Sequence, residues 1–315
     1  SGGSSSSNSV AGASGSGSVA DGGQWQCQDA FVLAEDIGDG AALFAIFDGH
    51  GDHGRAISMS AAARAETIMR EPAHHRSNER AEAALRLLCR QLQRELGETQ
   101  HTQYSGTTAC MALLCGDRLS IANVGDSRAV LVRRSGGAID SGGDGRGRGS
   151  EAVGRGSRGS EDGAPLSLVQ LTSDHKPEVP SERERILGKG GLIGPTPERT
   201  STPDATSGSS SSSSGGGSND NSSSSGGGSS SGGGGSSGGG WSARSMSLPN
   251  RVWLPTGSGP GLAMSRSLGD AVAHRVGVTH EPDVFHHAVG PADLLLLVAS
   301  DGVWDVLSHD EVLDV

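Results

Sequence analysis

Two uninterrupted apolar runs, each followed by an Asp-Gly pair, constrain the fold of this chain more than any other feature. The first run covers residues 41–47 and precedes Asp48; the second covers residues 294–299 and precedes Asp301 after one serine. Apolar runs of this length that end at turn residues are typical of buried strands. Because glycine lets the backbone turn sharply, each run should deliver a carboxylate to an edge of the core. Two such carboxylates from distant parts of the chain predict a shared hard cation and metal-assisted chemistry.

Glycine and serine limit how much of the 315-residue chain can fold. The chain contains 52 Gly and only 33% hydrophobic residues, and its three Ser/Gly-rich stretches cannot bury a core. We predict a disordered tail at 1–23 and low-complexity insertions at 135–164 and 195–247, the second of them a flexible coil. The remaining sequence is long enough for one well-buried domain, which we expect to span 24–315.

Charge, hydropathy and cysteine spacing limit which compartments and which partners we expect for the chain. The formal net charge of -11 disfavours nucleic acid or an anionic membrane as a partner, and it suits a cation-collecting cleft as well as simple solubility. No stretch approaches the ~18 apolar residues of a membrane span, and the start of the chain lacks the features of a signal peptide. The four cysteines show no metal-binding spacing, so we expect reduced thiols in an intracellular protein of the cytoplasm or nucleus.

Hydrophobic periodicity predicts both helices and strands. Four leucines recur at helical spacing across 78–97, and an Ala-rich segment without internal Gly or Pro precedes them. The predicted helices cover residues 55–70, 78–97 and 182–187, with two more beginning at 303 and 310. The predicted strands cover residues 30–33, 43–47, 107–114, 119–124, 129–132, 166–171, 251–254 and 294–299. The chain stops inside the last helix, so we expect a fragment of a longer protein.

Eight short motifs occur along the chain in a fixed order. Five of them are FDGHG at 47–51, SGTTA at 105–109, VGDSRAVL at 124–131, LAMSRSLGD at 262–270 and ASDGVWD at 299–305. Three supporting matches are LTSDHKP at 171–177, GG at 190–191 and EPDV at 281–284. Together they resemble the metal-dependent Ser/Thr protein phosphatases of type 2C, in an arrangement closest to plant, algal or protist members. The resemblance covers residues 28–194 and 251–315, interrupted by the loop at 135–164.

This resemblance implies both a fold and an activity. The fold is of the α+β class, a four-layer α/β/β/α sandwich of two antiparallel sheets flanked by helices, with a metal centre at one end. The activity is hydrolysis of phosphoserine and phosphothreonine in proteins by metal-activated water at a binuclear Mg²⁺ or Mn²⁺ centre, with no phosphoenzyme and with a third, weaker metal site. The expected partners are phosphorylated protein substrates, and the expected state is a monomer.

The resemblance also implies that five residues are metal ligands. In the family, the aspartate of the Phe-Asp-Gly-His motif bridges two metals and the next glycine offers its carbonyl; these roles fall on Asp48 and Gly49. The late Asp-Gly-x-Trp-Asp motif contributes Asp301, and Asp126 matches an aspartate that completes the third site with it. Asp29 belongs to the early acidic pair of the family. Carboxylates and backbone carbonyls are the ligands that Mg²⁺ and Mn²⁺ prefer.

Catalytic roles are assigned by the resemblance to Asp48 and His50. The histidine matches the family's general acid, which protonates the leaving group, and an imidazole pKa of ~6.5 suits that role near neutral pH. We expect Arg266 and Asp270 to hold the sheet edge and the nearby flap together rather than touch the chemistry. The Asp-His-Lys segment at 174–176 is interpreted as a structural turn or a substrate-side loop.

Three departures from the family pattern leave an alternative open. Gln28 stands where many members have a glutamate, so its contact with the second metal should be weaker or pass through water. Gln24 stands where a basic residue usually binds the substrate phosphate, and residues 1–54 contain no Lys or Arg. The family's last metal-ligating aspartate would lie beyond Val315. The alternative is a pseudophosphatase, in which the same fold serves as a phosphoprotein-binding or regulatory module.

A third interpretation rests on the arginines that alternate with glycines at 145–149, with further arginines at 155 and 158. Such tracts can bind RNA. Because this segment has no aromatic residues and is interspersed with acidic ones, we favour a solvated loop.

Overall fold

Strand β5 (Ala41–His50) is buried on both of its faces. Leu43 and Phe47 belong to the core beneath the helices, whereas Phe44 and Ile46 pack into the core between two sheets. Because successive side chains of a strand point to opposite faces, burial on both faces requires a continuous apolar run. The apolar run in the sequence is therefore explained, and it carries Asp48 to the end of this strand.

The computed structural model describes residues 9–12, 16–18, 24–71, 78–97, 99–134, 152–159, 165–196, 249–257 and 259–314. The chain divides into two units, Ser1–Thr196 with Pro249–Val315 and Pro197–Leu248, and every described residue belongs to the first. The predicted insertion at 195–247 lies outside the described residues beyond Thr196. The Arg/Gly segment at 145–149 lies outside them as well.

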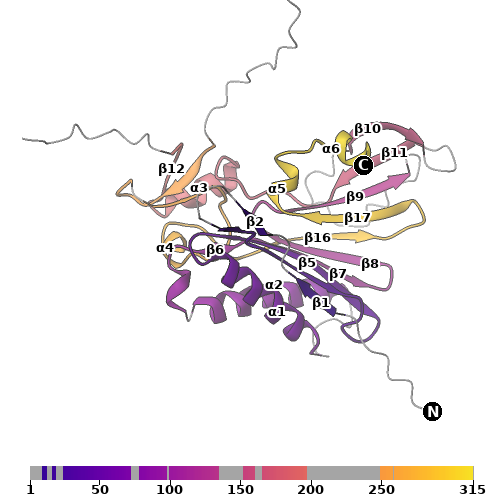
Figure 1. The fold of residues 1–315 in the computed structure, drawn as a ribbon, viewed down its shortest axis with the longest axis horizontal. Helices are drawn as coiled ribbons and strands as arrows, with labels where there is room; N and C mark the ends of the chain where they lie inside the picture. The colour runs from indigo at the N-terminus through magenta and orange to yellow at the C-terminus, as the bar shows by residue number, and fades with distance from the viewer. Residues whose placement is uncertain are drawn as a thin grey trace, which may run out of the picture. The chain divides into compact units, whose positions relative to one another are not determined.

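Two antiparallel sheets form the middle layers (Figure 1). In the described residues, the larger sheet has the order β1-β4-β5-β7-β8-β16 with β6 and β15 at its side, and the smaller has the order β10-β11-β9-β17. Besides β5, the larger sheet contains β1 (Ser9–Gly12), β4 (Asp29–Ala34), β6 (Gly106–Thr107), β7 (Ala109–Cys115), β8 (Arg118–Val124), β15 (Leu268–Gly269) and β16 (Asp283–Ala288). The smaller contains β9 (Arg128–Arg134), β10 (Ala152–Gly159), β11 (Pro165–Gln170) and β17 (Asp293–Ala299). Two minor sheets pair β12 (Leu192–Gly194), β13 (Arg251–Trp253) and β14 (Pro260–Leu262), and β2 (Ser16–Ser18) with β3 (Gln24–Gln26).

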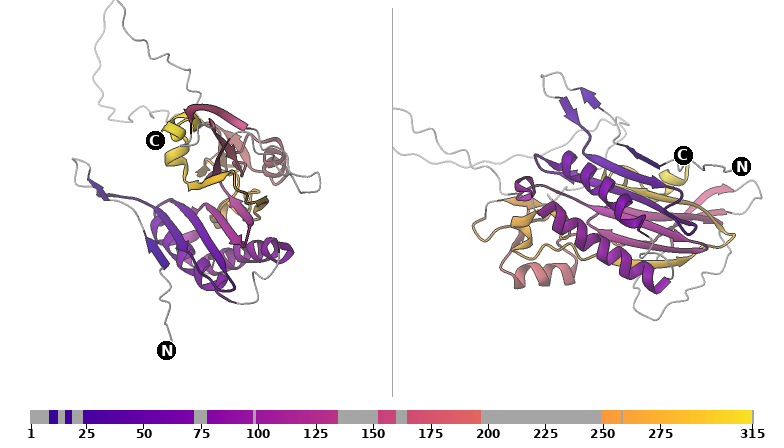
Figure 2. Two further views of the ribbon diagram at one scale, coloured as in Figure 1. Left: turned by 90° about the vertical axis from the view of Figure 1, so that its right-hand side faces the viewer. Right: turned by 90° about the horizontal axis from the view of Figure 1, so that it is seen from below.

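Helices cover the outer faces of both sheets. Helices α1 (Gly54–Met69) and α2 (Asn78–Gly97) lie side by side against the larger sheet (Figure 2), and α6 (His309–Asp314) packs on β10 and β11. This arrangement confirms the predicted α+β class with antiparallel sheets flanked by helices. The remaining helices are η1 (Gln100–Thr102), α3 (Pro180–Gly188), α4 (Ala271–His274) and α5 (Asp301–Trp304). In the part of the chain that the structure describes, no helix has the length and apolarity needed to cross a bilayer.

Three short strands fall inside segments that the composition predicted to be disordered or low in complexity. Strand β1 pairs with β4, and β2 pairs with β3, within the predicted tail at 1–23. Strand β10 pairs with β11 within the predicted insertion at 135–164. An edge strand is held by backbone hydrogen bonds, which do not require apolar side chains, so composition carries little information about such pairing. The other residues of these two segments lie outside the described ones.

A buried carboxylate joins α3 to the larger sheet. Glu182 is 1% exposed and accepts hydrogen bonds from Arg185, Arg266 and Ser265. Burial alone would raise the pKa of Glu182, but these hydrogen bonds and the charge of Arg266 hold that pKa well below its ordinary value. Arg266 also pairs with Asp283 of β16 at 2.8 Å. Arg266 therefore links the edge strand β16 to helix α3 through Glu182.

We predict that Glu182→Gln lowers the free energy of unfolding by about 3 kcal/mol near neutral pH, because it leaves two arginines without their buried anion. The folded-state pKa of Glu182 lies below the ordinary 4.5, so the stabilisation is fully present above 4.5 and is lost as the pH falls toward the folded value. The difference from wild type should therefore shrink in acid. Urea denaturation across the pH range measures it.

Glu184→Gln is the matched control, because Glu184 lies on the exposed side of the same helix. Its effect should stay within ~0.5 kcal/mol at every pH. If the difference in unfolding free energy between wild type and Glu182→Gln were the same at neutral and acidic pH, Glu182 would not be charged in the folded protein.

Candidate active site

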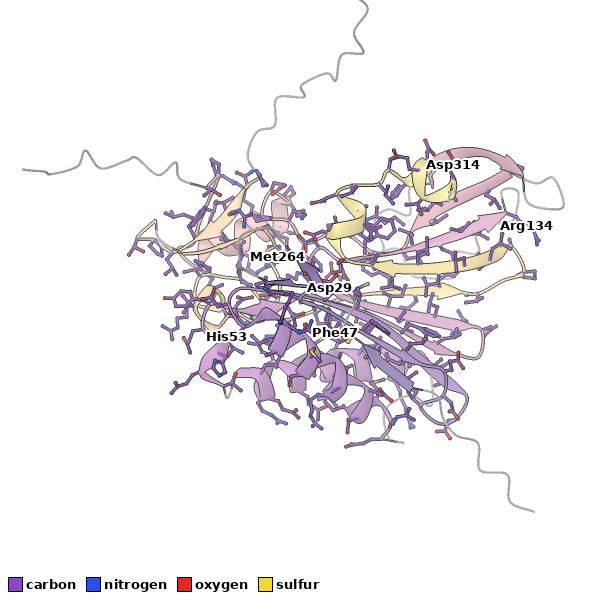
Figure 3. The ribbon with its side chains drawn as sticks, viewed as in Figure 1. Asp29, Phe47, His53, Arg134, Met264 and Asp314 are labelled. Carbon is purple, nitrogen blue, oxygen red and sulfur yellow. The ribbon has the colours of Figure 1, made fainter. Side chains whose placement is uncertain are left out.

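Three chain segments bring carboxylates together where the two sheets approach each other. Asp29 opens β4 and Asp48 lies near the end of β5, and the two stand directly opposite each other in the antiparallel register. Asp301 begins α5 immediately after β17, and the adjacent Ser300 donates to Asp29 Oδ2 at 2.9 Å. Figure 3 labels Asp29 in the region where the larger sheet lies next to α5. The structure thus brings together three of the residues that the sequence singled out.

The crowding of these carboxylates disfavours the ionised forms of Asp48 and Asp301. Burial, followed by the charges of Asp29 and Asp301 and hydrogen bonds with them, raises the pKa of Asp48 from its ordinary 3.8 to about 9. Burial, followed by the charge of Asp126, likewise raises the pKa of Asp301. Within the described residues, none of the three forms a salt bridge with Lys, Arg or His. Their negative charge is therefore shared among carboxylates.

Asp126 lies beside this group and has a cationic partner of its own. It follows β8 at a turn, is 1% exposed, and accepts a 2.5 Å hydrogen bond on Oδ2 from Lys176 Nζ. Burial alone would lower the pKa of Lys176, but the charge of Asp126 raises it, so this lysine stays positive. Asp126 Oδ1 has no hydrogen-bond partner among the described residues. Lys176 therefore belongs to the site, which the sequence interpretation of 174–176 as a turn or loop did not specify.

His50 is held by a carboxylate from a distant part of the chain. Its Nε2 lies 2.6 Å from Asp270 Oδ2, and Asp270 is completely buried. Burial alone would lower the pKa of His50, but the charge and hydrogen bond of Asp270, with the charges of Asp126 and Asp301, raise it. The backbone N–H of Asp270 also donates to Ser105 O, which joins the segment after β15 to the segment before β6 at the side of the larger sheet. Asp270 also contacts His50 directly, a contact that the sequence did not predict.

The glycines around Asp48 let the backbone approach closely. A Cβ on Gly49 would lie 2.7 Å from Gln28 O and would also clash with the backbone of Gly54. Gly49 N–H donates to Gln28 O at 3.2 Å, and Thr108 N–H donates to Asp48 O at 2.8 Å. The loop that carries Asp48, Gly49 and His50 is therefore held on both sides by backbone contacts.

An aromatic anchor fixes the position of Asp301. The Arg128 guanidinium lies 5.5 Å above the Trp304 ring and pairs with both oxygens of Asp174, at 3.0 and 2.7 Å. Trp304 Nε1 donates to Ala299 O at 2.9 Å, which ties α5 back to the end of β17. These contacts position the first residue of α5 beside the end of β5.

The donor set fits a hard divalent cation in its chemistry. Among the described residues, no group of three or more His, Cys, Asp or Glu side chains is arranged to hold a metal ion as it stands. The available donors are nonetheless all oxygens, as Mg²⁺ and Mn²⁺ prefer. Two further observations favour a cation: the raised pKa of Asp48 and the unpartnered Oδ1 of buried Asp126. A positive charge here would restore the ionised carboxylates and satisfy that oxygen.

Comparison with known proteins places these features in a family. The family model described as protein phosphatase 2C matches residues 18–201 and 237–315. "Probable protein phosphatase 2C 61" of Arabidopsis thaliana is 30% identical over 302 residues, which cover 93% of this chain and 69% of the relative. "Probable protein phosphatase 2C 64" of Oryza sativa subsp. japonica is 30% identical over 303 residues, or 91% of this chain and 52% of the relative.

Solved structures share the fold. The crystal structure of serine-threonine phosphatase 2C from Toxoplasma gondii aligns with a TM-score of 0.62 at 18% identity, covering 98% of this chain and 87% of that one. A C. elegans sex determining protein aligns with a TM-score of 0.56 at 16% identity, covering 98% and 55%. With the family match over more than half of its length and plant relatives at this identity, the chain belongs to the protein phosphatase 2C family of Ser/Thr protein phosphatases.

Proposed function

We propose that this chain hydrolyses phosphoserine and phosphothreonine in protein substrates by attack of water, at a centre that holds Mg²⁺ or Mn²⁺. The observation that carries the proposal is the contact among Asp29, Asp48 and Asp301; burial, together with these two neighbours, raises the pKa of Asp48 to about 9. Half-buried carboxylates that crowd together without a salt bridge are stabilised by a bound metal ion. The proposed ligands are these three carboxylates, Asp126 and the Gly49 carbonyl.

The metal and the protein have separable tasks in this proposal. When bound, Mg²⁺ or Mn²⁺ supplies activated water and offsets the charge of the phosphoryl oxygens. Asp48 contacts both Asp29 and Asp301, so it links β4 and β5 of the larger sheet to the start of α5, which follows the smaller sheet. His50 donates a proton to the leaving alkoxide of serine or threonine, and Asp270 fixes the orientation of its ring through Nε2.

Three of the four thiols of the chain favour water rather than cysteine as the nucleophile. Burial raises the pKa of Cys89 to about 12 and also raises the pKa of Cys110 and Cys115. The thiolate is the nucleophilic form of cysteine, so these residues are poorly suited to form a covalent phosphoenzyme. The proposed reaction therefore proceeds without one.

We predict that Asp48→Asn abolishes Mn²⁺-dependent hydrolysis of an aryl phosphate. The loss should exceed the ~10–100-fold that removal of an outer-shell partner costs, because Asp48 contacts both of the other carboxylates. Initial rates against Mn²⁺ concentration measure it. Asp52→Asn, an exposed carboxylate four residues along the same loop, is the matched control and should retain wild-type rates.

The same titration tests the alternative of a pseudophosphatase. Gln24 and Gln28, which replace a basic residue and a carboxylate of the family pattern, favour that alternative. If folded wild-type protein shows no turnover at millimolar Mn²⁺ but binds phosphopeptides, the hydrolase proposal is wrong and the binding module replaces it.

We predict that Asp270→Asn affects substrates according to their leaving group. An alkoxide leaves poorly and needs a proton, whereas an aryl oxide leaves readily, so kcat for a phosphoserine peptide should fall on the order of 100-fold and kcat for an aryl phosphate much less. His50→Gln should reproduce the same pattern, because both changes act on one proton donor. An equal loss on both substrates would show that Asp270 supports the fold rather than the acid.

A further inference from the structure

The side chain of Gln28 contacts the loop that carries the proposed metal ligands. With the amide assigned so that its nitrogen faces acceptors, the NH₂ group donates to Gly49 O at 3.0 Å and to Gly51 O at 3.2 Å. Gly49 O is the backbone carbonyl among the proposed ligands. The neutral side chain therefore bonds to the atom that a second cation would use.

Residues of the segment 49–58 contact both the side chain and the backbone of Gln28. A Cβ on Gly54 would lie 2.7 Å from the backbone of Gly49 and would also meet the Gln28 amide, so a residue larger than glycine would displace both. The backbone oxygen of Gln28 accepts hydrogen bonds from Ser58 Oγ at 2.5 Å and from Gly49 N–H at 3.2 Å. Backbone and side chain of Gln28 thus both bond to the segment 49–58, and the amide is part of that loop rather than a group free in solvent.

The amide changes the electrostatics on one side of the site. Its N–H groups place partial positive charge next to Gly49 O, whereas a carboxylate at position 28 would add a full negative charge. On this side the remaining anions are Asp29 and Asp48. On the other side, Asp48 lies with Asp301 and Asp126, whose Oδ1 has no partner among the described residues. The two sides therefore differ in their attraction for a divalent cation.

We propose that the Gln28 amide stands in for one of the two cations by holding the Gly49 carbonyl. The chain then binds one divalent ion tightly, on the Asp48–Asp301 side, and a second at least 10-fold more weakly, on the Gly49 side. The loop from Asp48 to Gly54 keeps its conformation in metal-free protein, because the amide supplies the contacts. This inference rests on the proposed metal centre.

Calorimetric titration of the full chain with Mn²⁺, with electron paramagnetic resonance counting bound ions, tests the two affinities. Wild type should show one tight and one weak ion. Gln28→Glu should tighten the second by roughly 10–100-fold and leave the first unchanged. Gln26→Glu adds the same charge at an exposed position two residues earlier and should behave as wild type.

Thermal unfolding provides a readout that needs neither substrate nor turnover. In EDTA, Gln28→Glu should unfold at a lower temperature than wild type, because a carboxylate cannot donate to the two carbonyls, and saturating Mn²⁺ should restore it. Gln28→Met, similar in size but without donors, should also lower the unfolding temperature in EDTA while leaving the second ion weak. Gln28→Met therefore measures the effect of the lost hydrogen bonds without that of an added charge. If Gln28→Glu does not fold, Gln28→Met still tests the role of the amide.

Three results overturn the inference in distinguishable ways. Two Mn²⁺ ions of equal affinity in wild type, with no change in Gln28→Glu, would show that the amide does not compete with a cation. Absence of any Mn²⁺ binding in folded wild type, Gln28→Glu and Gln26→Glu alike would overturn the metal centre itself, and this inference with it. An EDTA unfolding temperature unaffected by Gln28→Met would refute the structural role of the amide.

Discussion

The repulsion among Asp29, Asp48 and Asp301 is the interaction on which the arrangement of this site depends. Three carboxylates at the meeting point of β4, β5 and α5 oppose burial, and burial together with the neighbouring carboxylates raises the pKa of Asp48. Hydrogen bonds of Asp48 with Asp29 and Asp301 offset part of this repulsion, and packing elsewhere holds the segments in place. The core on both faces of β5 and the Trp304 anchor beneath α5 provide that force. The site is thus a local cost that the hydrophobic sandwich offsets.

Other acids in the described residues show what the three lack. Asp126 pairs with Lys176, Asp174 with Arg128, and Glu182 with Arg185 and Arg266. Asp270 has His50. The fold therefore supplies counter-charges readily, yet in the part of the chain that the structure describes it forms no salt bridge with Asp29, Asp48 or Asp301. Selective omission of a cation at the point where three carboxylates meet is the pattern expected of a site that recruits its positive charge from solution.

Sequence reasoning was accurate where a side-chain pattern determines the structure. Both apolar runs form strands, and their ends bring Asp48 and Asp301 together, because hydrophobic patterning and turn residues are local properties. The expectation that both strands are buried is correct for β5 and wrong for β17, whose Leu294 and Leu295 are exposed at 42% and 52%. The Asp270–His50 contact joins residues separated by 220 positions, and no local pattern encodes such a pairing. The partnership of Lys176 with Asp126 depends on how a loop folds back over 50 positions. Strands β1 and β10 depend on backbone hydrogen bonds, which composition does not record.

Gln28 illustrates a limit of a different kind. Its neutrality was visible in the sequence and pointed only to a lost charge; the donor geometry toward Gly49 and Gly51 was not visible. A carboxylate at this position would add a fourth negative charge beside Asp29 and Asp48, so the metal-free protein would be less stable and its metal affinity higher. An amide reverses both effects, since it removes repulsion and supplies two hydrogen bonds in their place. A family site can in this way trade metal affinity for stability in the absence of metal through one residue, without any change in the surrounding sheets.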